Sequence, residues 1–475
     1  MERANRKGQA RLALVGLLTI ILVMTSTACK SKNSQIGYEE AYDIGLQAYT
    51  YGLPLLETNK TFLSMTGGQS DQVNQFKHVR SFNDSNSKVV VAPGASGLSS
   101  IAWLDLTKEA QVLHIPEVTG HYFVLALLDP YTEDVCNLGS AHQTPAGDYV
   151  ICGPSQHGIS LPAGTSQINV DYNRIWIIGS TQVKDLNDIP SVNKIQDGFT
   201  IKPLSKYGTD YQSPPFEQPN IIPKKYELPT GLEFFDALCQ LMQQFPPPEA
   251  DKEQLKAFKS VGIGPGLRPS QDHGLSAEII RGLTNAADAG QGKIKTDTGV
   301  VYEESAKKHN GYLLGGFGTY GTNYQLRAVV AEIGLGAFSS DQTIFALTLS
   351  DQSMKPLNGS SRYVMHLAEA PPATEGWSIT VYDTKGQLIQ NTIDRHEFSD
   401  SSIMIKNNDG SIDIFFQANQ PAEASEAENW LPVKSGQGFQ VIFRLMAPEQ
   451  DSIKGILEGR GWQPPFLSSV STKAN

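Results

Sequence analysis

Histidines are the residues of this chain best able to bind a metal ion or move a proton, and its nine histidines are scattered along the sequence. His114 and His121 flank one predicted turn, while His366 has a comparable place in a later predicted strand. A β-sandwich can gather such residues into a metal site. A histidine in a strand is more often hydrogen-bonded or solvated, so we expect structural histidines and keep a metal site at His114 and His121 as the alternative.

Three arginines stand in otherwise apolar segments: Arg327, Arg395 and Arg444. A buried guanidinium keeps its charge and needs acidic or hydrogen-bonding partners. One interpretation is a structural network of ion pairs, for which the candidate acids are Asp351, Asp383 and Asp394. The functional alternative is a cleft between domains that binds an anion or another ligand. The residues assigned to this candidate cleft are Arg327, Arg395, Arg444, Trp377, Tyr382 and Asp383.

Covalent catalysis would need a serine or cysteine beside a histidine that an acid orients. The chain has no Gly-x-Ser-x-Gly segment, and Ser96 lies between two predicted strands rather than before a helix. Asp129 and Asp383 could belong to a carboxylate pair for glycoside hydrolysis, but aspartates at turns more often accept hydrogen bonds from backbone amides. Phosphate-loop and dinucleotide motifs are absent from the sequence, so the cofactor is unknown and the enzyme question stays open.

Short apolar runs, separated by turns rich in Gly and Pro, must position these residues. Runs of this kind recur roughly every 8–12 residues in both halves of the chain, as in β-sandwiches and jelly rolls rather than parallel α/β sheets. We predict a mainly β fold, α+β overall, with two jelly-roll-like antiparallel β-sandwich domains and a helical connecting segment. The predicted strands include Val89–Val91, Ile101–Leu106, Gln111–Ile115, His121–Leu128, Tyr363–Leu367, Trp377–Tyr382, Ser411–Phe416 and Gln440–Leu445.

Helical periodicity appears at the start and in the middle of the chain. Tyr38–Thr58 has one apolar stripe, which Gly52 and Pro54 should interrupt. Gly231–Phe245, Leu275–Ala289 and Tyr324–Ile333 also predict helices. These patterns predict a signal peptide at 1–28, a tether at 29–37, an N-terminal β domain at 38–200, a wrapping loop and helical connector at 201–340, and a C-terminal β domain at 341–475.

The two predicted β regions are weakly alike. His121–Asp129 and Trp377–Asp383 are both predicted strands with an aromatic residue at or next to their first position, and both end in Asp at a turn. Each follows a strand with a central histidine, His114 or His366. This similarity favours two related sandwiches.

The first residues have the pattern of a processing signal. Basic residues precede an apolar run, Leu12–Met24, that is too short to span a bilayer as a mature helix. Small residues then precede Cys29, as in a bacterial lipobox, although Ser26 stands where that pattern prefers Leu. We expect lipidation of Cys29, palmitate included, and an extracytoplasmic protein anchored to the bacterial cell membrane. An ordinary secretory peptide and an uncleaved anchor are the alternatives.

Charge and cysteine content add two expectations. Removal of residues 1–28 takes away four basic residues and one acidic residue, which changes the formal net charge from −11 to −14. An acidic surface argues against nucleic acid as a partner. Cys136 and Cys152 flank a loop between two predicted strands and could pair in an exported protein, whereas buried free thiols are the favoured interpretation.

Several segments resemble a pair of bacterial domain-of-unknown-function families, twelve fifty-four on the N-terminal side and twelve fourteen on the C-terminal side. The resemblance rests on Tyr51–Leu55, Lys88–Leu106, Trp176–Val183, Pro356–Gly359, Trp377–Asp383 and Asn429–Pro432. It implies two jelly-roll-like domains with a helical insertion, and it brings no settled reaction.

The chain departs from the family pattern at three serines. Ser96 and Ser99 stand in a stretch where the family tends to place Asn-Asn-Asp-Thr-x-Tyr, and Ser180 stands where it tends to place Arg. If those family residues form a polar site, that site is eroded in this chain. We therefore expect a binding or structural protein of the cell envelope that holds a glycan or small organic ligand between its β domains. An exported hydrolase or metal-dependent enzyme with its site between the domains is the alternative.

Overall fold

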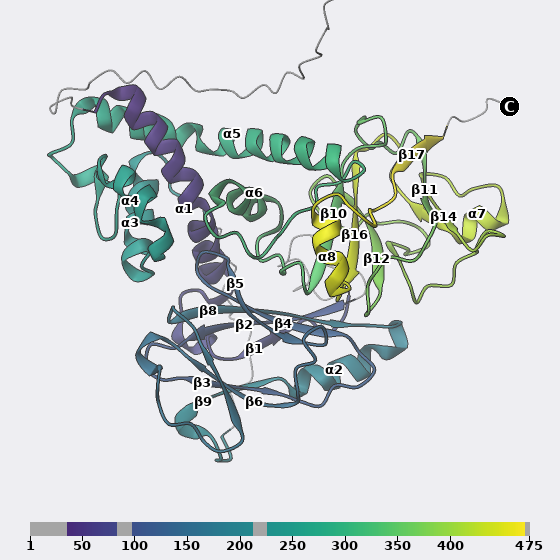
Figure 1. The fold of residues 1–475 in the computed structure, drawn as a ribbon, viewed down its shortest axis with the longest axis horizontal. Coiled ribbons are helices and arrows are strands. Elements are labelled where there is room, and N and C mark those ends of the chain that lie inside the picture. The colour runs from purple at the N-terminus through teal and green to yellow at the C-terminus, as the bar shows by residue number, and fades with distance from the viewer. Residues whose placement is uncertain (1–35, 83–96, 212–225, 471–475) are drawn as a thin grey trace, which may run out of the picture.

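The computed structural model describes residues 36–82, 97–211 and 226–470. It contains two β-rich domains and a helical segment between them, so the predicted α+β architecture is confirmed (Figure 1). The predicted signal peptide, Cys29, the predicted strand Val89–Val91 and Ser96 lie outside the described residues. Within the described ranges, no helix is both long enough and apolar enough to cross a bilayer.

The N-terminal domain has two sheets that enclose one apolar core. In β8, Ile175 and Ile177 face this core, whereas Trp176 and Ile178 face away from it toward the helical segment. In spatial order, the sheet nearer the helical segment, here called the N-terminal inner sheet, holds β1 (Phe76–His78), β2 (Gly97–Asp105), β8 (Arg174–Gln182), β4 (Phe123–Leu128) and β5 (Asp134–Gly139). The N-terminal outer sheet holds β7 (Thr165–Asn169), β6 (Gly147–Cys152), β3 (Gln111–Ile115) and β9 (Thr200–Pro203).

The C-terminal domain is built in the same way. Its core takes Ile379 and Phe443 from one sheet and Met365 and Phe416 from the other. The C-terminal inner sheet holds β10 (Thr343–Thr348), β16 (Phe439–Met446), β12 (Trp377–Asp383) and β13 (Glu397–Ser399). The C-terminal outer sheet holds β15 (Trp430–Pro432), β14 (Ile412–Gln417), β11 (Arg362–Leu367) and β17 (Leu467–Val470).

The two domains share one strand order. Adding eight to each strand number of β2-β8-β4-β5 gives β10-β16-β12-β13, and the same shift turns β7-β6-β3-β9 into β15-β14-β11-β17. The pairs β6–β7 and β14–β15 are parallel in both domains, whereas the other strand pairs are antiparallel. Only β1 lacks a counterpart among the described strands. The predicted relation between the two β regions therefore extends to the whole topology, while the jelly-roll description stays a prediction.

The repeat extends to individual side chains. Oδ1 of Asp129 accepts hydrogen bonds from the backbone N–H groups two and four residues later, at 2.8 and 3.0 Å, and Oδ1 of Asp383 does the same at 2.8 and 3.0 Å. His114 lies 2.7 Å from Asp148 on the paired strand, and His366 lies 2.7 Å from Asp413 in the same arrangement. These matches give an alignment of the two domains that the site below uses.

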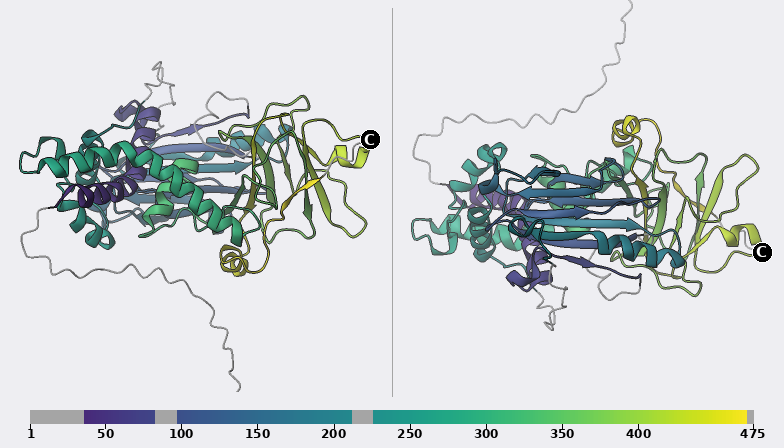
Figure 2. Two further views of the ribbon diagram at one scale, coloured as in Figure 1. Left: turned by 90° about the horizontal axis from the view of Figure 1, so that it is seen from above. Right: turned by 90° about the horizontal axis from the view of Figure 1, so that it is seen from below.

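Two long helices hold the domains in place. The helical segment contains α1 (Tyr38–Thr66), α3 (Leu232–Gln244), α4 (Lys252–Lys259), α5 (Ala277–Lys308) and α6 (Tyr324–Gly334). α1 packs closely on α5 because small residues meet there: a Cβ added to Gly282 would lie only 2.8 Å from Ala41. The far end of α1 reaches the N-terminal domain, where Phe62 packs on Trp103. The far end of α5 reaches the C-terminal domain, as Figure 2 shows. There Tyr302 hydrogen-bonds to Ser350.

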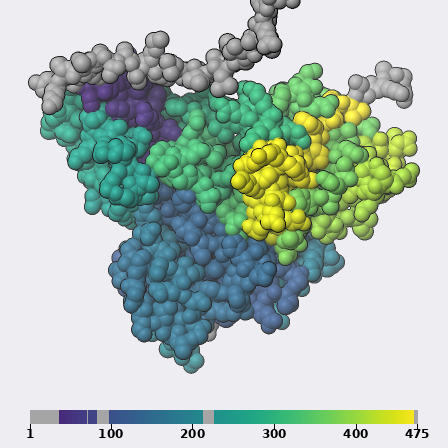
Figure 3. Space-filling view, viewed as in Figure 1, coloured from purple at the N-terminus to yellow at the C-terminus, as the bar shows by residue number. Residues whose placement is uncertain are grey.

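Three local predictions differ from the structure. α1 continues through Pro54 where a break was expected, because Gly52 and its neighbours are buried against α3 and this packing offsets the cost of the proline. α1 also packs with the helical segment rather than forming part of the N-terminal sandwich. β9, which includes the start of the predicted wrapping loop, pairs with β3. Figure 3 shows the helical segment and the C-terminal domain resting together on the N-terminal domain.

Candidate functional site

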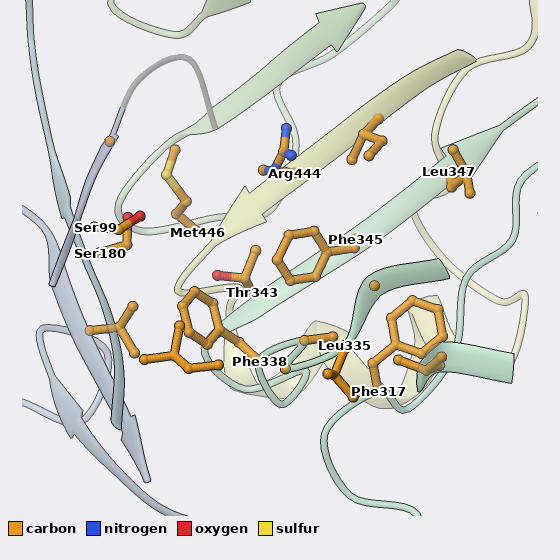
Figure 4. Close-up of a pocket in the computed structure, with 18 of the residues that line it drawn as sticks. Ser99, Ser180, Phe317, Leu335, Phe338, Thr343, Phe345, Leu347, Arg444 and Met446 are labelled. Atoms are coloured by element: carbon orange, nitrogen blue, oxygen red, sulfur yellow. The ribbon is translucent and has the colours of Figure 1, made fainter. Parts of the chain in front are cut away.

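A pocket of about 190 Å³ lies between the two inner sheets and beside the end of α6. By the same kind of measure, one water molecule needs only roughly 10–15 Å³. The pocket is therefore large enough for an organic molecule. Figure 4 shows Ser99 and Ser180 on one side of it and Phe345 and Met446 on the other.

The N-terminal wall is a patch of the inner sheet that combines apolar and hydroxyl side chains. Gly97 permits a close approach here, because a Cβ on it would lie 2.7 Å from Oγ of Ser180. Ser99 and Ser180 are direct neighbours on the paired strands β2 and β8. Within the described residues, neither hydroxyl has a hydrogen-bond partner. The side chains of this wall are Ser99, Tyr122, Val124, Ile178, Ser180 and Gln182.

The C-terminal wall carries Arg444, which is the single charged side chain among the described residues that line the pocket. Its Nη1 donates to Oγ1 of Thr380 at 2.9 Å and its Nη2 donates to Oη of Tyr382 at 2.7 Å. Its guanidinium also lies 5.6 Å from the ring centre of Phe345. Burial raises the pKa of Tyr382 more than Arg444 lowers it, so the phenol stays neutral and can accept this hydrogen bond. The side chains of this wall are Thr343, Phe345, Leu347, Ile442, Arg444 and Met446.

The third wall comes from α6 and the segments beside it. Asn323 caps α6 by accepting a hydrogen bond from the N–H of Leu326, and the helix ends at Gly334. Gly336 then has a φ of +83°, and a Cβ there would lie 2.4 Å from Ile178, so only glycine fits against the inner sheet. The side chains of this wall are Leu313, Phe317, Val330, Ile333, Leu335 and Phe338.

The internal repeat aligns the two sheet walls residue by residue. When Asp129 is matched with Asp383, the strand pairings match Ser180 with Arg444 and Ser99 with Phe345. The same positions of the fold therefore carry two small hydroxyl side chains on one wall and a cation beside a phenyl ring on the other. The pocket can surround an apolar group and offer hydrogen bonds at its N-terminal wall.

Of the residues predicted for an interdomain cleft, Arg444 lines this pocket and Tyr382 supports it from behind. Ser99 and Ser180, which were named as departures from the family pattern at an eroded site, also line it. Trp377 packs in the core of the C-terminal domain, and Asp383 holds a turn. Arg395 donates to the backbone carbonyls of Ala427, Glu428 and Trp430.

Arg327 is buried at the junction between α6 and the N-terminal domain. Its Nη2 lies 2.6 Å from Oε1 of Glu133 and also donates to the carbonyl of Gly321. Arg327 thus pairs with Glu133 rather than with Asp351, Asp383 or Asp394, because the chain fold brings the loop after β4 to α6. Its ion pair fixes α6 beside the pocket.

The histidines predicted as metal ligands have separate carboxylate partners. His114 lies 2.7 Å from Asp148, and His121 lies 3.0 Å from Asp188. Throughout the described ranges, no group of three or more His, Cys, Asp and Glu side chains is arranged to hold a metal ion. The structure therefore favours the structural interpretation of these histidines.

One serine–histidine contact was not found from the sequence. Oγ of Ser100 lies 2.9 Å from Nδ1 of His78, and Gln196 donates to the same hydroxyl at 3.3 Å. Ser100 is buried within the sandwich, on the opposite face of β2 from Ser99, and burial lowers the pKa of His78 to about 3. A histidine that resists protonation beside an inaccessible hydroxyl suits a structural contact better than covalent catalysis.

The cysteines of the described residues are free thiols. Cys136 is in β5 and Cys152 is in β6, so the two lie in different sheets. Burial raises the pKa of the Cys136 thiol to about 11. The free-thiol interpretation agrees with the structure, and the disulfide between these residues is not formed.

Sequence reasoning missed the third wall and the wall positions of Tyr122, Gln182 and Phe338. The apolar residues of the connector follow an ordinary helical pattern. Such a pattern predicts a helix but does not predict which domain packs against it. The weak internal repeat of the sequence could have pointed to the two sheet walls of the pocket, because it aligns Ser180 with Arg444.

Comparisons with known proteins follow the same division of the chain. The chain is similar over 91% of its length, and over 100% of the other chain, to the crystal structure of the VPA0106 protein from Vibrio parahaemolyticus, with 21% identity and a TM-score of 0.64. This similarity shows a shared fold.

An uncharacterized protein from Burkholderia cenocepacia aligns with 10% identity and a TM-score of 0.43, over 91% of this chain and 93% of that one. No curated protein matches the chain. Residues 73–203 match the family model described as protein of unknown function DUF1254, and residues 342–450 match the one described as protein of unknown function DUF1214.

Proposed function

From the architecture of this chain, a DUF1254 module followed by a DUF1214 module, we propose that it is a binding protein that holds a small organic ligand between its two β domains. The pocket between the inner sheets is the observation that carries this proposal. Ligand pockets of this kind occur where domains meet, and they combine a mostly apolar lining with a few polar groups that orient the ligand.

The composition of the pocket favours an organic ligand with an apolar body over a glycan. Phenyl rings from Phe317, Phe338 and Phe345 and aliphatic side chains from all three walls would desolvate an apolar group, which is favourable at roughly 25 cal/mol per Å². A glycan would bury many hydroxyls against these side chains without partners, and each such loss is costly.

The proposed location of this binding protein is the cell envelope. The signal pattern and Cys29 support a mature chain that is exported and held at the membrane by lipid. In that setting the pocket would meet ligands outside the cytoplasm.

Binding of an uncharged fluorescent probe, N-phenyl-naphthylamine, tests the proposal. The full chain carries Cys29→Ser in this experiment so that it can be handled without detergent, which would compete for the pocket. We expect saturable binding with a rise in probe fluorescence, because the probe enters an apolar environment. Ser180→Phe, which places a phenyl ring in the pocket, should weaken binding by at least about tenfold.

Ser166→Phe is the matched control. Ser166 is exposed on β7 of the outer sheet, so the same side chain is added to the same domain away from the pocket. Binding that is absent, or that both variants weaken equally, contradicts the proposed function. Thermal unfolding of both variants checks that Ser180→Phe still folds.

A further inference from the structure

We propose that the ligand of this pocket is an uncharged amphiphile: an apolar body with a neutral hydroxyl, ester or amide head that binds to Ser99 and Ser180. This inference rests on the proposed function and names the chemical class of its ligand. Three features of the described residues support it: unused hydroxyls, an arginine already engaged, and an otherwise uncharged lining.

The N-terminal wall offers hydrogen bonds that the protein itself does not use. Within the described residues, the hydroxyls of Ser99 and Ser180 and the side-chain amide of Gln182 have no hydrogen-bond partner, and all three line the pocket. A hydroxyl and an amide can each donate and accept. This combination matches a head group that also does both, such as an alcohol or an amide.

The C-terminal wall holds a cation whose hydrogen bonds are directed at its own sheet. Two nitrogens of Arg444 donate to Thr380 and Tyr382, and Thr380 in turn donates to the carboxylate of Glu397. These hydrogen bonds hold the guanidinium against the C-terminal inner sheet, on the opposite wall from Ser99 and Ser180. The guanidinium also lies 5.6 Å from the ring centre of Phe345, which supplies apolar surface on the same wall.

The other described residues that line the pocket carry no charge. A charged head at Ser99 and Ser180 would lose its hydration and gain only neutral hydrogen bonds, and burial of an uncompensated charge is far more costly than burial of a hydroxyl. A neutral head avoids this cost. The apolar body would then extend from Ser99 and Ser180 toward Phe338 and Phe345.

Displacement of N-phenyl-naphthylamine by three molecules with one decyl chain tests this inference. They are decanol, decanoate and decyltrimethylammonium, which differ in the charge of the head. We expect decanol to displace the probe at a concentration at least about tenfold lower than either charged molecule. The double variant Ser99→Ala, Ser180→Ala should weaken decanol binding about tenfold, as expected for the loss of two neutral hydrogen bonds, and its thermal unfolding checks that it still folds. Ser166→Ala is the matched control and should change nothing.

A second variant tests the inference by adding a charge to the pocket instead of removing hydrogen bonds. Ser180→Arg places on β8 the residue that β16 carries at the equivalent position. This added cation should reverse the order, so that decanoate displaces the probe better than decanol.

The combination of results shows whether the neutral-head inference fails alone or the proposed function fails with it. Probe binding with decanoate preferred by the unaltered pocket, or with no preference among the three heads, overturns the neutral-head inference and leaves the proposed function standing. An unchanged decanol affinity in the double alanine variant also overturns it. Absence of binding by the probe and by all three molecules overturns the proposed function and the inference together.

Discussion

Equivalent residues of the two domains lie in different physical environments, and Asp129 and Asp383 show this most clearly. Both carboxylates close the same turn with the same two backbone hydrogen bonds. Asp129, however, is 6% exposed and faces the ion pair of Arg327 and Glu133. Burial raises the pKa of Asp129 to about 7, and the hydrogen bonds and Arg327 offset only part of this rise.

The raised pKa of Asp129 predicts a dependence of stability on pH. In the folded protein this group binds a proton up to about pH 7, whereas its ordinary pKa in an unfolded chain is 3.8. Its contribution to the free energy of unfolding is therefore full below about pH 4 and is lost as the pH rises through 7. Asp129→Asn should reduce the fall in unfolding free energy between pH 5 and pH 8 by roughly 1–3 kcal/mol, as measured by urea denaturation at both values.

The internal repeat supplies the control for this measurement. Asp383→Asn makes the same substitution in the equivalent turn, so it reports what the amide does to the turn itself. An Asp129→Asn protein that loses as much stability as the unaltered protein between the two pH values would refute the assignment.

At the residue scale, sequence patterns predicted some contacts and could not predict others. The shared central histidines pointed to related sandwiches, and both proved to face an aspartate on the neighbouring strand. The partner of Arg327 was not predictable, because Glu133 is 194 residues away in the chain and meets α6 only through the fold.

At the scale of elements, the contact between α1 and α5 depends on glycines, although glycine has a low helix propensity and weakens the sequence-based prediction of a helix. Gly290 of α5 lies against the ring of Tyr49, and a Cβ there would be 2.4 Å from that ring. The other face of Tyr49 stacks on Phe234 of α3, with 4.2 Å between ring centres. The ring therefore has little freedom to move away.

Two glycines of the same helix give a matched prediction. Gly290→Ala should lower the free energy of unfolding by about 1–3 kcal/mol, because the added methyl group overpacks the interface with Tyr49. Gly292→Ala, where no atom lies within 4 Å of the added Cβ, should raise it by up to about 1 kcal/mol through helix propensity. Urea denaturation of both variants gives the comparison, and a stabilising Gly290→Ala would show that the helices can separate at little cost.

The length of α5 shows where periodicity loses its predictive value. The apolar stripe predicted a helix over Leu275–Ala289, and the structure has one over Ala277–Lys308. Its second half, residues 293–308, carries four Lys and three acidic residues, so the stripe is interrupted there. Contacts of Tyr302 and Ala306 with the C-terminal domain stabilise this half, and such contacts are tertiary.

At the scale of the molecule, two duplicated sandwiches face each other across α6 and enclose the pocket. Among the contacts that join the domains directly, Tyr122 donates to the carbonyl of Gln342 at 3.0 Å, and His142 lies 2.7 Å from Asp341. Single residues in loops make these contacts, and no sequence pattern marks them. The sequence could therefore predict two β domains and a connector, but not which faces meet.

The N-terminal segment predicts where this whole molecule resides. If Cys29 receives lipid, its acyl chains hold the exported protein at the membrane, because each buried CH₂ group contributes about 0.8 kcal/mol and more than one chain is needed for stable anchoring. A protein with only the short apolar run as a cleaved secretory signal would have no such attachment.

Cys29→Ser separates these possibilities in a bacterial host that modifies lipoproteins. The unaltered chain should sediment with membranes and enter solution only with detergent, whereas Cys29→Ser should appear in the soluble extracytoplasmic fraction. Metabolic labelling with radioactive palmitate should mark the first protein and not the second. Cys239→Ser is the control, because Cys239 is a buried free thiol in α3 and its substitution leaves the N-terminal segment unchanged. Retention of Cys29→Ser in the membrane fraction would instead indicate an uncleaved anchor, since lipid could then no longer account for the attachment.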